Sequence, residues 1–337
     1  MSRAEAIYNY KLYSFSQVNK FSKYAWMTAT ELSKQYNRNK LFLWMDMLWC
    51  NFRYGAMDTH EYLLYDFYHK SHKERSTYFT RRMYYRLIKS FDFATFKRLE
   101  EKDNQYKEYS PFIKRRWMVV DENTNESDII DFIAQLKTVV VKPVSSDSGV
   151  GIFKIYYEDK EKINFLLKEI GKKKYIIEET LQNCKELHIL NPNSLNTVRV
   201  TYVLDKNGNP IIFNVMLRTA IDSNAVVDNW GAGGILLEID KNSGTILKPG
   251  LDELNNKYSE HPISKVCFIG FQIPRFKEML LFAIKVAKHN KKVVNGGIDI
   301  AITDNGFDLV EINFPPANIG YQVFGKGALD KIRLMNN

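Results

Sequence analysis

Cysteine is scarce in this sequence of 337 residues. The three cysteines, Cys50, Cys184 and Cys267, lie far apart, and neither a CxxC motif nor a neighbouring pair of histidines accompanies them. This odd, widely spaced set excludes a disulfide framework and gives no zinc motif, and it is typical of proteins in a reducing compartment.

Long apolar runs are also missing. The most apolar stretch near the N-terminus, LFLWMDMLWC (residues 41–50), contains an aspartate and is too short to span a bilayer. The stretch MSRAEAIYNYKLYSF at the start lacks the apolar core of a signal peptide. We therefore expect a cytoplasmic protein.

Several catalytic signatures are absent as well. The sequence has no GxxxxGK[ST] loop, no GxSxG motif and no HRD or DFG signature, and its six histidines are scattered. Gly149 and Gly151 lack the third glycine and the helix of a dinucleotide fingerprint. These absences speak against P-loop enzymes, protein kinases and catalysis by a Ser–His or Cys–His pair.

Positive charge is concentrated in the first third of the chain. Residues 1–120 hold 22 Lys or Arg against 12 Asp or Glu, a balance of +10, and residues 121–337 hold the other 26 against 27, a balance of −1. The same first 120 residues carry 28 of the 46 aromatic residues. We interpret this change in composition as a change of domain.

Aromatic and basic residues recur at helical spacing in the N-terminal part, as in HEYLLYDFYHKSHKE (60–74) and YRLIKSFDFATFKRLEEK (85–102). This pattern predicts a helical region. Its aromatic residues could form an ordinary core beneath solvated charges, or the surface could bind an acidic polysaccharide or an anionic membrane. Single-stranded nucleic acid is the partner that we favour least.

After residue 136 the chain changes to short segments rich in β-branched and aromatic residues. The predicted strands are 138–144, 149–157, 174–179, 197–205, 210–220, 234–240 and 297–304. Turn residues predict hairpins at 204–211, 239–246 and 302–309, and helices are predicted at 159–172 and 275–290. The pattern indicates an α+β protein with much antiparallel sheet, and not a doubly wound parallel fold.

Lys142 ends one predicted strand and precedes the loop SSDSGVG (145–151). Backbone N–H groups of such a loop can surround phosphate oxygens, and the lysine adds a cation beside them. The alternative is a Lys-Pro pair that only ends a strand. Arg199 and Arg218 lie in apolar strands, where an arginine pairs with an anion, either a ligand or a structural carboxylate.

The segment GGIDIAITDNGFDLVEINFPP (296–316) places Asp299, Glu311 and Asn313 in apolar strands. A three-residue loop at 304–306 would set Asp299 opposite Glu311, with Asn313 on the same face. A two-residue loop would put the two carboxylates on opposite faces. Three oxygen donors on one face suit Mg²⁺ held together with substrate phosphates, and an edge hairpin with solvated carboxylates is the alternative.

The order of these motifs resembles the ATP-grasp superfamily over about residues 100–325. The motifs are KPVSSDSGVG, YIIEE, LNTVRV, MLR, DNxxxGG, GIDIAI and VEIN. The segments LNPNSLNTVRV, VVDNWGAGGILLEID, EHPIS and LVEINFPPANIGYQ resemble the sugar-transfer-associated ATP-grasp branch, which is linked to surface-polysaccharide gene clusters. The resemblance implies an α+β ATP-grasp fold, in which two lobes clasp ATP behind a helical N-terminal region. The implied domains are 1–100, 101–179 and 180–337.

The resemblance also implies a role for each candidate residue. Nucleotide contacts would come from Lys102, Lys142, Ser145, Ser146, Ser148, Gly149, Gly151, Glu178, Glu179, Glu186 and Asn229. Arg199, Arg218 and Lys142 would act on the transferred phosphate. Asp299, Glu311 and Asn313 would hold Mg²⁺.

The implied activity is that of an ATP- and Mg²⁺-dependent carboxylate–amine ligase that forms an acylphosphate and releases ADP and phosphate. Its substrates would be a uronic-acid carboxylate of a capsule or other surface polysaccharide and an amino acid or small amine. We also expect peripheral contact with membrane-bound polysaccharide machinery. The alternatives are a phosphotransferase acting on a sugar hydroxyl and a non-catalytic protein that binds nucleotides and polyanions.

Overall fold

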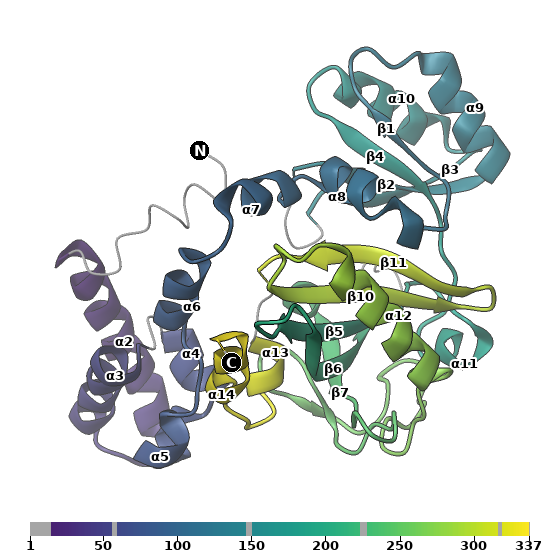
Figure 1. Cartoon of the computed structure of the whole chain (residues 1–337). Coiled ribbons are helices and arrows are strands. Elements are labelled where there is room, and N and C mark those ends of the chain that lie inside the picture. The colour runs from purple at the N-terminus through teal and green to yellow at the C-terminus, as the bar shows by residue number, and fades with distance from the viewer. Residues whose placement is uncertain (1–14, 56–58, 146–149, 223–227, 316–318, 337) are drawn as a thin grey trace.

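The structure is a computed structural model that describes residues 15–55, 59–145, 150–222, 228–315 and 319–336. Its strands form two sheets, and every strand pairing in both is antiparallel. Helices α2 to α5, within residues 15–75, lie at one end of the molecule, and α9 and α10, within residues 126–170, lie at the other (Figure 1). The predicted α+β class with a helical N-terminal region is confirmed, and the predicted domain boundaries at residues 100 and 179 stay a prediction.

The N-terminal region is helical, and its part up to residue 78 has a core of its own. Buried residues from Ile88 to Tyr109 belong to a different core, which they share with residues between Val144 and Phe314. Its helices are α2 (Phe15–Tyr36), α3 (Lys40–Tyr54), α4 (Thr59–Leu64), α5 (His72–Arg75), α6 (Arg81–Ile88), α7 (Phe93–Leu99) and α8 (Lys102–Glu108), with short 3₁₀ turns η1 (Phe67–His69) and η2 (Ser110–Phe112). The side chain of Asn39 caps α3 by accepting from the backbone N–H groups of Leu41 and Phe42. Tyr62 and Phe67 are among the aromatic residues buried in the core of the part up to residue 78.

A four-stranded sheet with strand order β1-β4-β2-β3 forms the small lobe. Its elements are β1 (Trp117–Val120), α9 (Glu126–Leu136), β2 (Thr138–Pro143), β3 (Phe153–Tyr156), α10 (Lys160–Ile170) and β4 (Tyr175–Glu179). Ile133 of α9 and Leu166 of α10 are buried in one cluster with Val139 and Val141 of β2. Both helices therefore cover the same face of the sheet.

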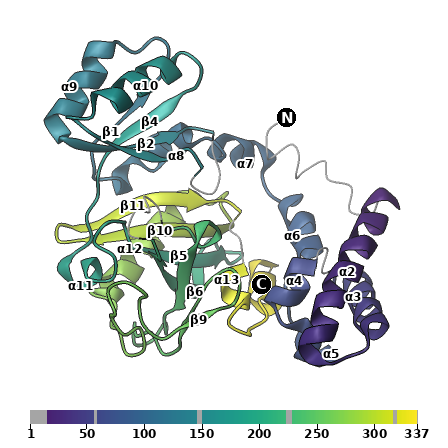
Figure 2. The same ribbon diagram turned by 180° about the vertical axis from the view of Figure 1, so that it is seen from behind.

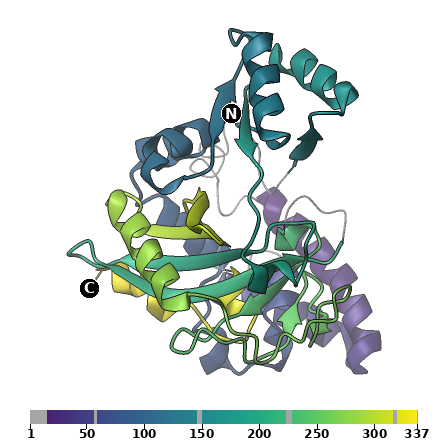
Figure 3. The same ribbon diagram turned by 90° about the vertical axis from the view of Figure 1, so that its right-hand side faces the viewer.

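A seven-stranded sheet with strand order β11-β10-β5-β6-β7-β8-β9 forms the large lobe. Its elements are α11 (Lys185–His188), β5 (Thr197–Leu204), β6 (Pro210–Ala220), η3 (Trp230–Ala232), β7 (Gly234–Glu238), β8 (Gly250–Leu251), β9 (Lys257–Tyr258), α12 (Phe276–His289), β10 (Asn295–Thr303) and β11 (Gly306–Asn313). Helix α12 packs on β10, β5 and β6. Figure 3 shows the blue and teal small lobe above the green and yellow large lobe.

The C-terminal helices α13 (Ile319–Gln322) and α14 (Leu329–Arg333), with the turn η4 (Leu334–Asn336), return to the N-terminal region. In Figure 2, α13 lies beside α4 and α6. The buried amide of Gln322 accepts from the backbone N–H of Phe79 at 2.6 Å and donates to its carbonyl at 2.9 Å and to the Tyr65 hydroxyl at 3.1 Å. A buried polar contact therefore joins the C-terminal helices to the N-terminal helical region.

Most predicted elements are confirmed to within a few residues. The predicted helices 159–172 and 275–290 correspond to α10 and α12, and the predicted strand 210–220 coincides with β6. Strand β1 and helix α9 were not predicted. None of the helices in the described residues is long and apolar enough to cross a membrane.

Candidate functional site

A cavity of about 590 Å³ lies between the two sheets and is the focus of the candidate site. Strands β2, β3 and β4 of the small lobe contribute to its walls, and so do β5, β6, β10 and β11 of the large lobe. Helix α8 and the connection after β4 close its sides through Lys102 and residues 180–183. The volume is in the range of small-molecule sites.

The alternation of β2 explains why a lysine lies in an otherwise apolar strand. Val139 and Val141 are buried against α9 and α10, whereas Thr138, Val140 and Lys142 line the cavity. Successive side chains of a strand point to opposite faces, so the residues of one face share the lobe core and those of the other face share the cavity. Lys142 is therefore directed to the site by the same pattern that builds the small lobe.

Lys142 forms a buried ion pair with Glu178 of β4, with 2.5 Å between Nζ and Oε1. Glu178 also accepts from Nε of Arg115 at 2.8 Å and from the Tyr106 hydroxyl. Burial alone would raise the pKa of Glu178, but Arg115 and Lys142 lower it to about 2. Burial alone would lower the pKa of Lys142, and Glu178 together with Tyr106 raises it. Both groups are therefore charged at neutral pH.

Arg115 joins the two lobes at the edge of this cluster. Its side chain donates to Glu178 of the small lobe and to Asp308 of β11 in the large lobe. The Asp308 carboxylate also accepts from the backbone N–H groups of Lys114 and Arg115, at 3.0 and 2.9 Å. Burial alone would lower the pKa of Arg115, but Glu178, Tyr106 and Asp308 raise it. The guanidinium is thus a fixed cation that ties the position of Glu178 to β11.

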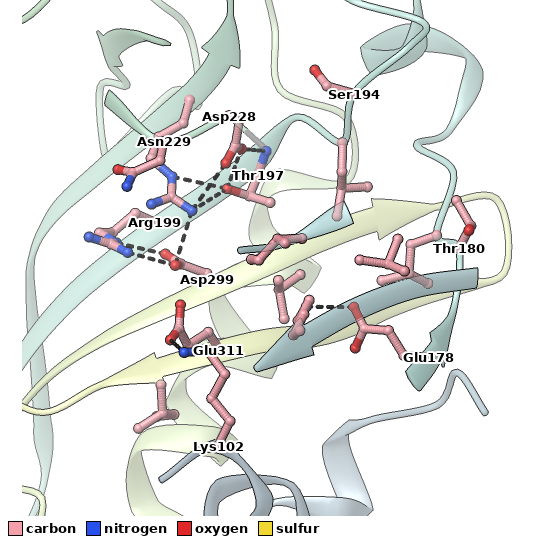
Figure 4. A pocket seen from close by; sticks show the side chains of 18 of the residues that line it. Lys102, Glu178, Thr180, Ser194, Thr197, Arg199, Asp228, Asn229, Asp299 and Glu311 are labelled. Carbon is pink, nitrogen blue, oxygen red and sulfur yellow. Dashed lines mark hydrogen bonds and ion pairs between the residues drawn. The ribbon is translucent and has the colours of Figure 1, made fainter. Parts of the chain in front are cut away.

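On the large-lobe wall, the buried carboxylate of Asp299 holds two arginines. Arg199 donates to it through Nε and Nη2, both at 2.6 Å (Figure 4). Nη2 of Arg218 lies 3.0 Å from Oδ2 of the same carboxylate. Burial alone would raise the pKa of Asp299, but Arg199 and Arg218 lower it. The bidentate contact fixes the plane of the Arg199 guanidinium at the cavity wall.

Thr197 and Asp228 contact the guanidinium of Arg218 and fix its position. The Thr197 hydroxyl accepts from Nε and Nη2 of Arg218 at 3.1 and 2.8 Å and donates to Asp228 at 2.6 Å. Burial raises the pKa of Asp228, although Arg218 and Thr197 oppose that shift. Figure 4 shows Thr197, Asp228 and Asn229 grouped beside Asp299.

The β10–β11 hairpin has the predicted pairing of Asp299 with Glu311, but its loop is shorter than predicted and its pairing contains a shift. We predicted that a three-residue loop would set Asp299 opposite Glu311, but Thr303 pairs directly with Gly306 across a two-residue loop. The pairing then shifts, because Ile300 faces Leu309 and Asp299 faces Glu311. Val310 is the extra residue of a β-bulge, which moves Glu311 back into place. The predicted loop is wrong and the predicted pairing is confirmed.

The three predicted metal-binding residues lie together on this hairpin. Asn313 donates through Nδ2 to Asp299 at 3.3 Å, which leaves its amide oxygen for another partner, and Glu311 lines the cavity with Lys102 Nζ 3.9 Å away. Asp299 already accepts four N–H groups, two from Arg199 and one each from Arg218 and Asn313, so an ion would take the place of one of these donors, whereas Glu311 is partly exposed. One or two carboxylates with substrate oxygens are the usual donors to Mg²⁺, so the residues fit this ion. No cluster of three His, Cys, Asp or Glu suited to a metal occurs in the described residues.

The structure brings most of the predicted site residues together. The cavity is lined by Lys102, Lys142, Glu178, Arg199, Arg218, Asn229, Asp299, Glu311 and Asn313. Ser145, Gly151, Glu179 and Glu186 are not among the lining residues. Ser146, Ser148 and Gly149 lie outside the described residues.

Two of the predicted residues away from the wall have evident structural roles. Glu179 accepts from the backbone N–H of Arg116 at 3.1 Å, and its own N–H donates to the Arg116 carbonyl, so it joins β4 to the segment before β1. Gly151 has a φ of 77° in a tight approach to Pro143, which requires glycine. The side chain of Glu186 is exposed on α11.

Sequence reasoning missed several residues of the site. They are Tyr106, Arg115, Lys154, His188, Thr197 and Asp228. Lys154 could have been found, because β3 pairs with β2 so that Lys154 faces Val140 on the cavity side. Asp228 directly precedes Asn229 in the DNxxxGG motif. Arg115 carries no comparable signal, since it is one of several basic residues before β1.

Comparison with known proteins agrees with the motifs. A family model described as sugar-transfer associated ATP-grasp matches residues 95–336. No curated protein matches the sequence. Among solved structures, a D-alanine–D-alanine ligase from Bacillus anthracis is 15% identical with a TM-score of 0.44, and the match covers 73% of this chain and 68% of that chain.

Two further solved structures are similarly distant. The D-cycloserine synthetase DcsG is 11% identical with a TM-score of 0.47, over 72% of this chain and 71% of its own. An N5-carboxyaminoimidazole synthase from Aspergillus clavatus is 11% identical with a TM-score of 0.46, over 73% of this chain and 53% of its own. The family match spans well over half of this chain and contains the whole cavity wall, with the motifs in their expected order. The chain therefore belongs to the sugar-transfer-associated ATP-grasp family.

Proposed function

We propose that this protein is an ATP-dependent ligase that couples a carboxylate to an amine in the cavity between its lobes. The observation that carries the proposal is the convergence of basic side chains from both lobes on one cavity: Lys102, Lys142, Lys154, Arg199 and Arg218. Membership of the ATP-grasp family supports ATP as the nucleotide.

The charge balance of the cavity fits Mg²⁺-ATP better than a bare polyanion. Five carboxylates line the same walls as the five basic residues: Glu100, Glu178, Asp228, Asp299 and Glu311. A site for a bare triphosphate would repel that ligand through these carboxylates. A nucleotide that brings a divalent cation carries less net negative charge, and the carboxylates and Asn313 can face that cation.

In the proposed reaction, an oxygen of the substrate carboxylate attacks the γ-phosphorus of ATP, and the bond from that phosphorus to the bridging oxygen of ADP breaks. The product is an acylphosphate. The amine then attacks the acyl carbon, loses a proton and expels phosphate, which leaves an amide. Both partners of the first step are anionic, so the main task of the protein is to neutralise and align them.

The chain's own residues provide this neutralisation. Arg199 and Arg218 are fixed by Asp299 at the large-lobe wall and would hold the transferred phosphate. Lys142 is held by Glu178 on the small-lobe wall and would contact the phosphates of the nucleotide. Mg²⁺ bound by Glu311, Asn313 and Asp299 would screen the phosphate charge. No side-chain nucleophile is needed for either step.

We further propose that the carboxylate belongs to a uronic acid of a capsule or other surface polysaccharide precursor, and that the amine is an amino acid or a small amine. The family description, which associates these proteins with sugar transfer, supports this choice. The cavity volume of about 590 Å³ lies within the range of small-molecule sites and is compatible with this proposal.

The test is incubation of the full chain with Mg²⁺-ATP, pooled uronic acids and pooled amines, followed by assay of ADP and mass spectrometry. We expect ADP and a product whose mass equals the acid plus the amine minus water. A phosphorylated sugar with no amine in it would instead establish a phosphotransferase. Nucleotide binding without ADP release under any combination would leave a binding protein and contradict the proposal.

The matched variant is Arg218→Ala. Asp299 keeps its bidentate contact with Arg199, and Asp228 loses its ion pair with Arg218 but keeps two hydrogen bonds from Thr197, so the fold should survive the change. We expect ADP release to fall by a factor of about 10² or more, because one fixed cation at the transferred phosphate is lost. Turnover close to that of the wild type would remove Arg218 from the reaction.

A further inference from the structure

Helix α3 carries apolar residues on its solvent-facing side. Leu41, Phe42, Met45, Trp49 and Phe52 form what we call the α3 stripe, and all five are exposed. At 100° per residue they fall within an arc of about 100° along the whole helix. Phe52 is 72% exposed and Trp49 is 54% exposed, and their rings lie 6.4 Å apart.

The opposite face of α3 is also apolar, but it is buried. Leu43, Met47, Cys50 and Tyr54 lie in the core of the N-terminal region. A surface helix of a globular protein normally has polar residues opposite its buried face. The stripe is therefore not needed for the core, and an exposed aromatic and aliphatic surface of this kind marks an interaction site.

The stripe continues onto α2 through an aromatic contact. Trp26 of α2, which is exposed, meets Trp44 of α3 edge to face, with 5.8 Å between ring centroids. The ammonium of Lys40 lies 3.8 Å from the centroid of the Trp26 ring. The two helices also pack on the same core. Their outward faces therefore adjoin along this contact.

Basic residues surround this apolar surface. Residues 15–54 contain six Lys or Arg and two Asp or Glu, a balance of +4. One of the two acids, Asp46, is already paired with Arg75. On the outward face of α2, exposed Lys20, Lys23 and Lys34 lie within an arc of about 60° that also contains exposed Met27.

We propose that the outward face of α2 and α3 docks on an anionic lipid bilayer. Trp, Phe, Leu and Met would enter the boundary between headgroups and acyl chains, and the lysines would meet anionic headgroups. An acidic polysaccharide would use the lysines but would leave the α3 stripe in water. A second copy of the chain would bring the same excess of positive charge and would be repelled. The helices at this surface lie at the end of the molecule away from the small lobe (Figure 1).

The experiment is co-sedimentation of the full chain with vesicles of phosphatidylcholine alone and with vesicles that contain about 30 mol% phosphatidylglycerol. We expect binding to the anionic vesicles that is at least ten-fold tighter than binding to the neutral ones and that weakens as salt is raised. The double substitution W49S and F52S should weaken binding to anionic vesicles by at least ten-fold.

Two controls separate the proposal from general stickiness and from unfolding. Leu254→Ser removes an apolar side chain that is 82% exposed in the large lobe, and it should leave vesicle binding unchanged. The double substitution K20E and K23E keeps the α3 stripe and should reduce binding to anionic vesicles only. All variants should retain the wild-type melting temperature, because none of the changed side chains is buried.

The proposal is overturned by any of three results. The wild type could fail to bind anionic vesicles at low salt, or W49S with F52S could bind as well as the wild type. In the third result, the wild type self-associates in analytical ultracentrifugation, the W49S and F52S double variant is monomeric, and both bind vesicles equally well. That result would assign the α3 stripe to contact with a second copy of the chain.

Discussion

At the scale of single residues, buried charges with several partners build the site. Lys142, Glu178 and Arg115 share one cluster, and Asp299 holds Arg199 and Arg218 in another. Removing the only ionic partner of a buried charge leaves that charge uncompensated and out of contact with water, which costs more free energy than the pair contributes. Stability and charge placement are therefore linked in this cavity.

Substitution of Arg115 tests this link. We expect Arg115→Ala to lower the free energy of unfolding by about 3–5 kcal/mol, because Glu178 and Asp308 lose a shared buried cation. Urea denaturation measures the change. The control is Arg116→Ala, which removes an exposed neighbour and should cost less than about 1 kcal/mol. Equal losses in the two variants would contradict the role given to Arg115.

The pKa of Glu178 predicts a specific pH dependence. Its folded-state pKa of about 2 lies below the ordinary value of 4.5, so its ionised form stabilises the fold fully above about pH 4.5. That contribution is lost as the pH falls from about 4.5 to about 2. We therefore expect the difference in free energy of unfolding between wild type and Glu178→Gln to be constant above pH 5 and to shrink toward pH 2. A difference independent of pH over the acid range would count against the ion-paired carboxylate.

Which of these residues could be foreseen depends on sequence context. Lys142, Arg199, Arg218 and Asp299 are charges inside apolar strands, and such residues demand a partner. Arg115 has no such contrast, because Lys114 and Arg116 flank it. Its importance arises from tertiary contacts with residues that are far away in the sequence.

At the scale of elements, strands and helices with strong periodicity were predictable, and irregular pairing was not. Strand β6 and helices α10 and α12 follow plain patterns and clear turn residues. The bulge at Val310 left no mark in the sequence, since valine fits a regular strand equally well. The correct pairing of Asp299 with Glu311 was thus predicted from a loop length that the hairpin does not have.

The hairpin loop depends on Gly306, whose φ of 125° is unfavourable for residues with a side chain. We expect Gly306→Ala to lower the free energy of unfolding by about 1–3 kcal/mol. The matched control is Gly171→Ala, at the end of α10, where φ is −66° and no atom lies within 4 Å of the added methyl group. That change should be neutral or stabilise the protein by about 0.5 kcal/mol. Thermal denaturation of both variants tests the difference, and equal effects would show that the loop tolerates a side chain.

At the scale of the whole molecule, the C-terminal helices are joined to the N-terminal helical region. Gln322 of α13 satisfies backbone groups of Phe79 and Ala328 as well as the Tyr65 hydroxyl. The composition of residues 1–120 predicted a separate helical region, but nothing in the sequence pointed to its contacts with the C-terminal helices. These include the amide of Gln322, the backbone hydrogen bond from Leu329 to Thr77 and the packing of Phe79 with Ala328 and Ile332.

Loss of the Gln322 amide should weaken the contact between the C-terminal helices and the N-terminal region. We expect Gln322→Leu to lower the free energy of unfolding by about 2–4 kcal/mol, because the buried polar groups that it now satisfies lose their partner. Limited proteolysis should cut the N-terminal helices of the variant faster than those of the wild type. Gln272→Ala, which removes an exposed amide, is the control and should leave the digestion unchanged. A digestion pattern of Gln322→Leu that matches the wild type would show that other contacts hold the region.

The affinity for Mg²⁺-ATP, measured by isothermal titration calorimetry, tests the central claim that the cavity binds a nucleotide through its fixed cations. The comparison is between the wild type, Lys142→Met and Lys174→Met. Glu178 keeps Arg115 when Lys142 is replaced, and Lys174 does not line the cavity. We predict that the wild type and Lys174→Met bind with equal affinity and that Lys142→Met binds at least about ten-fold more weakly. Equal affinity of all three proteins, or no binding by the wild type, would contradict the account.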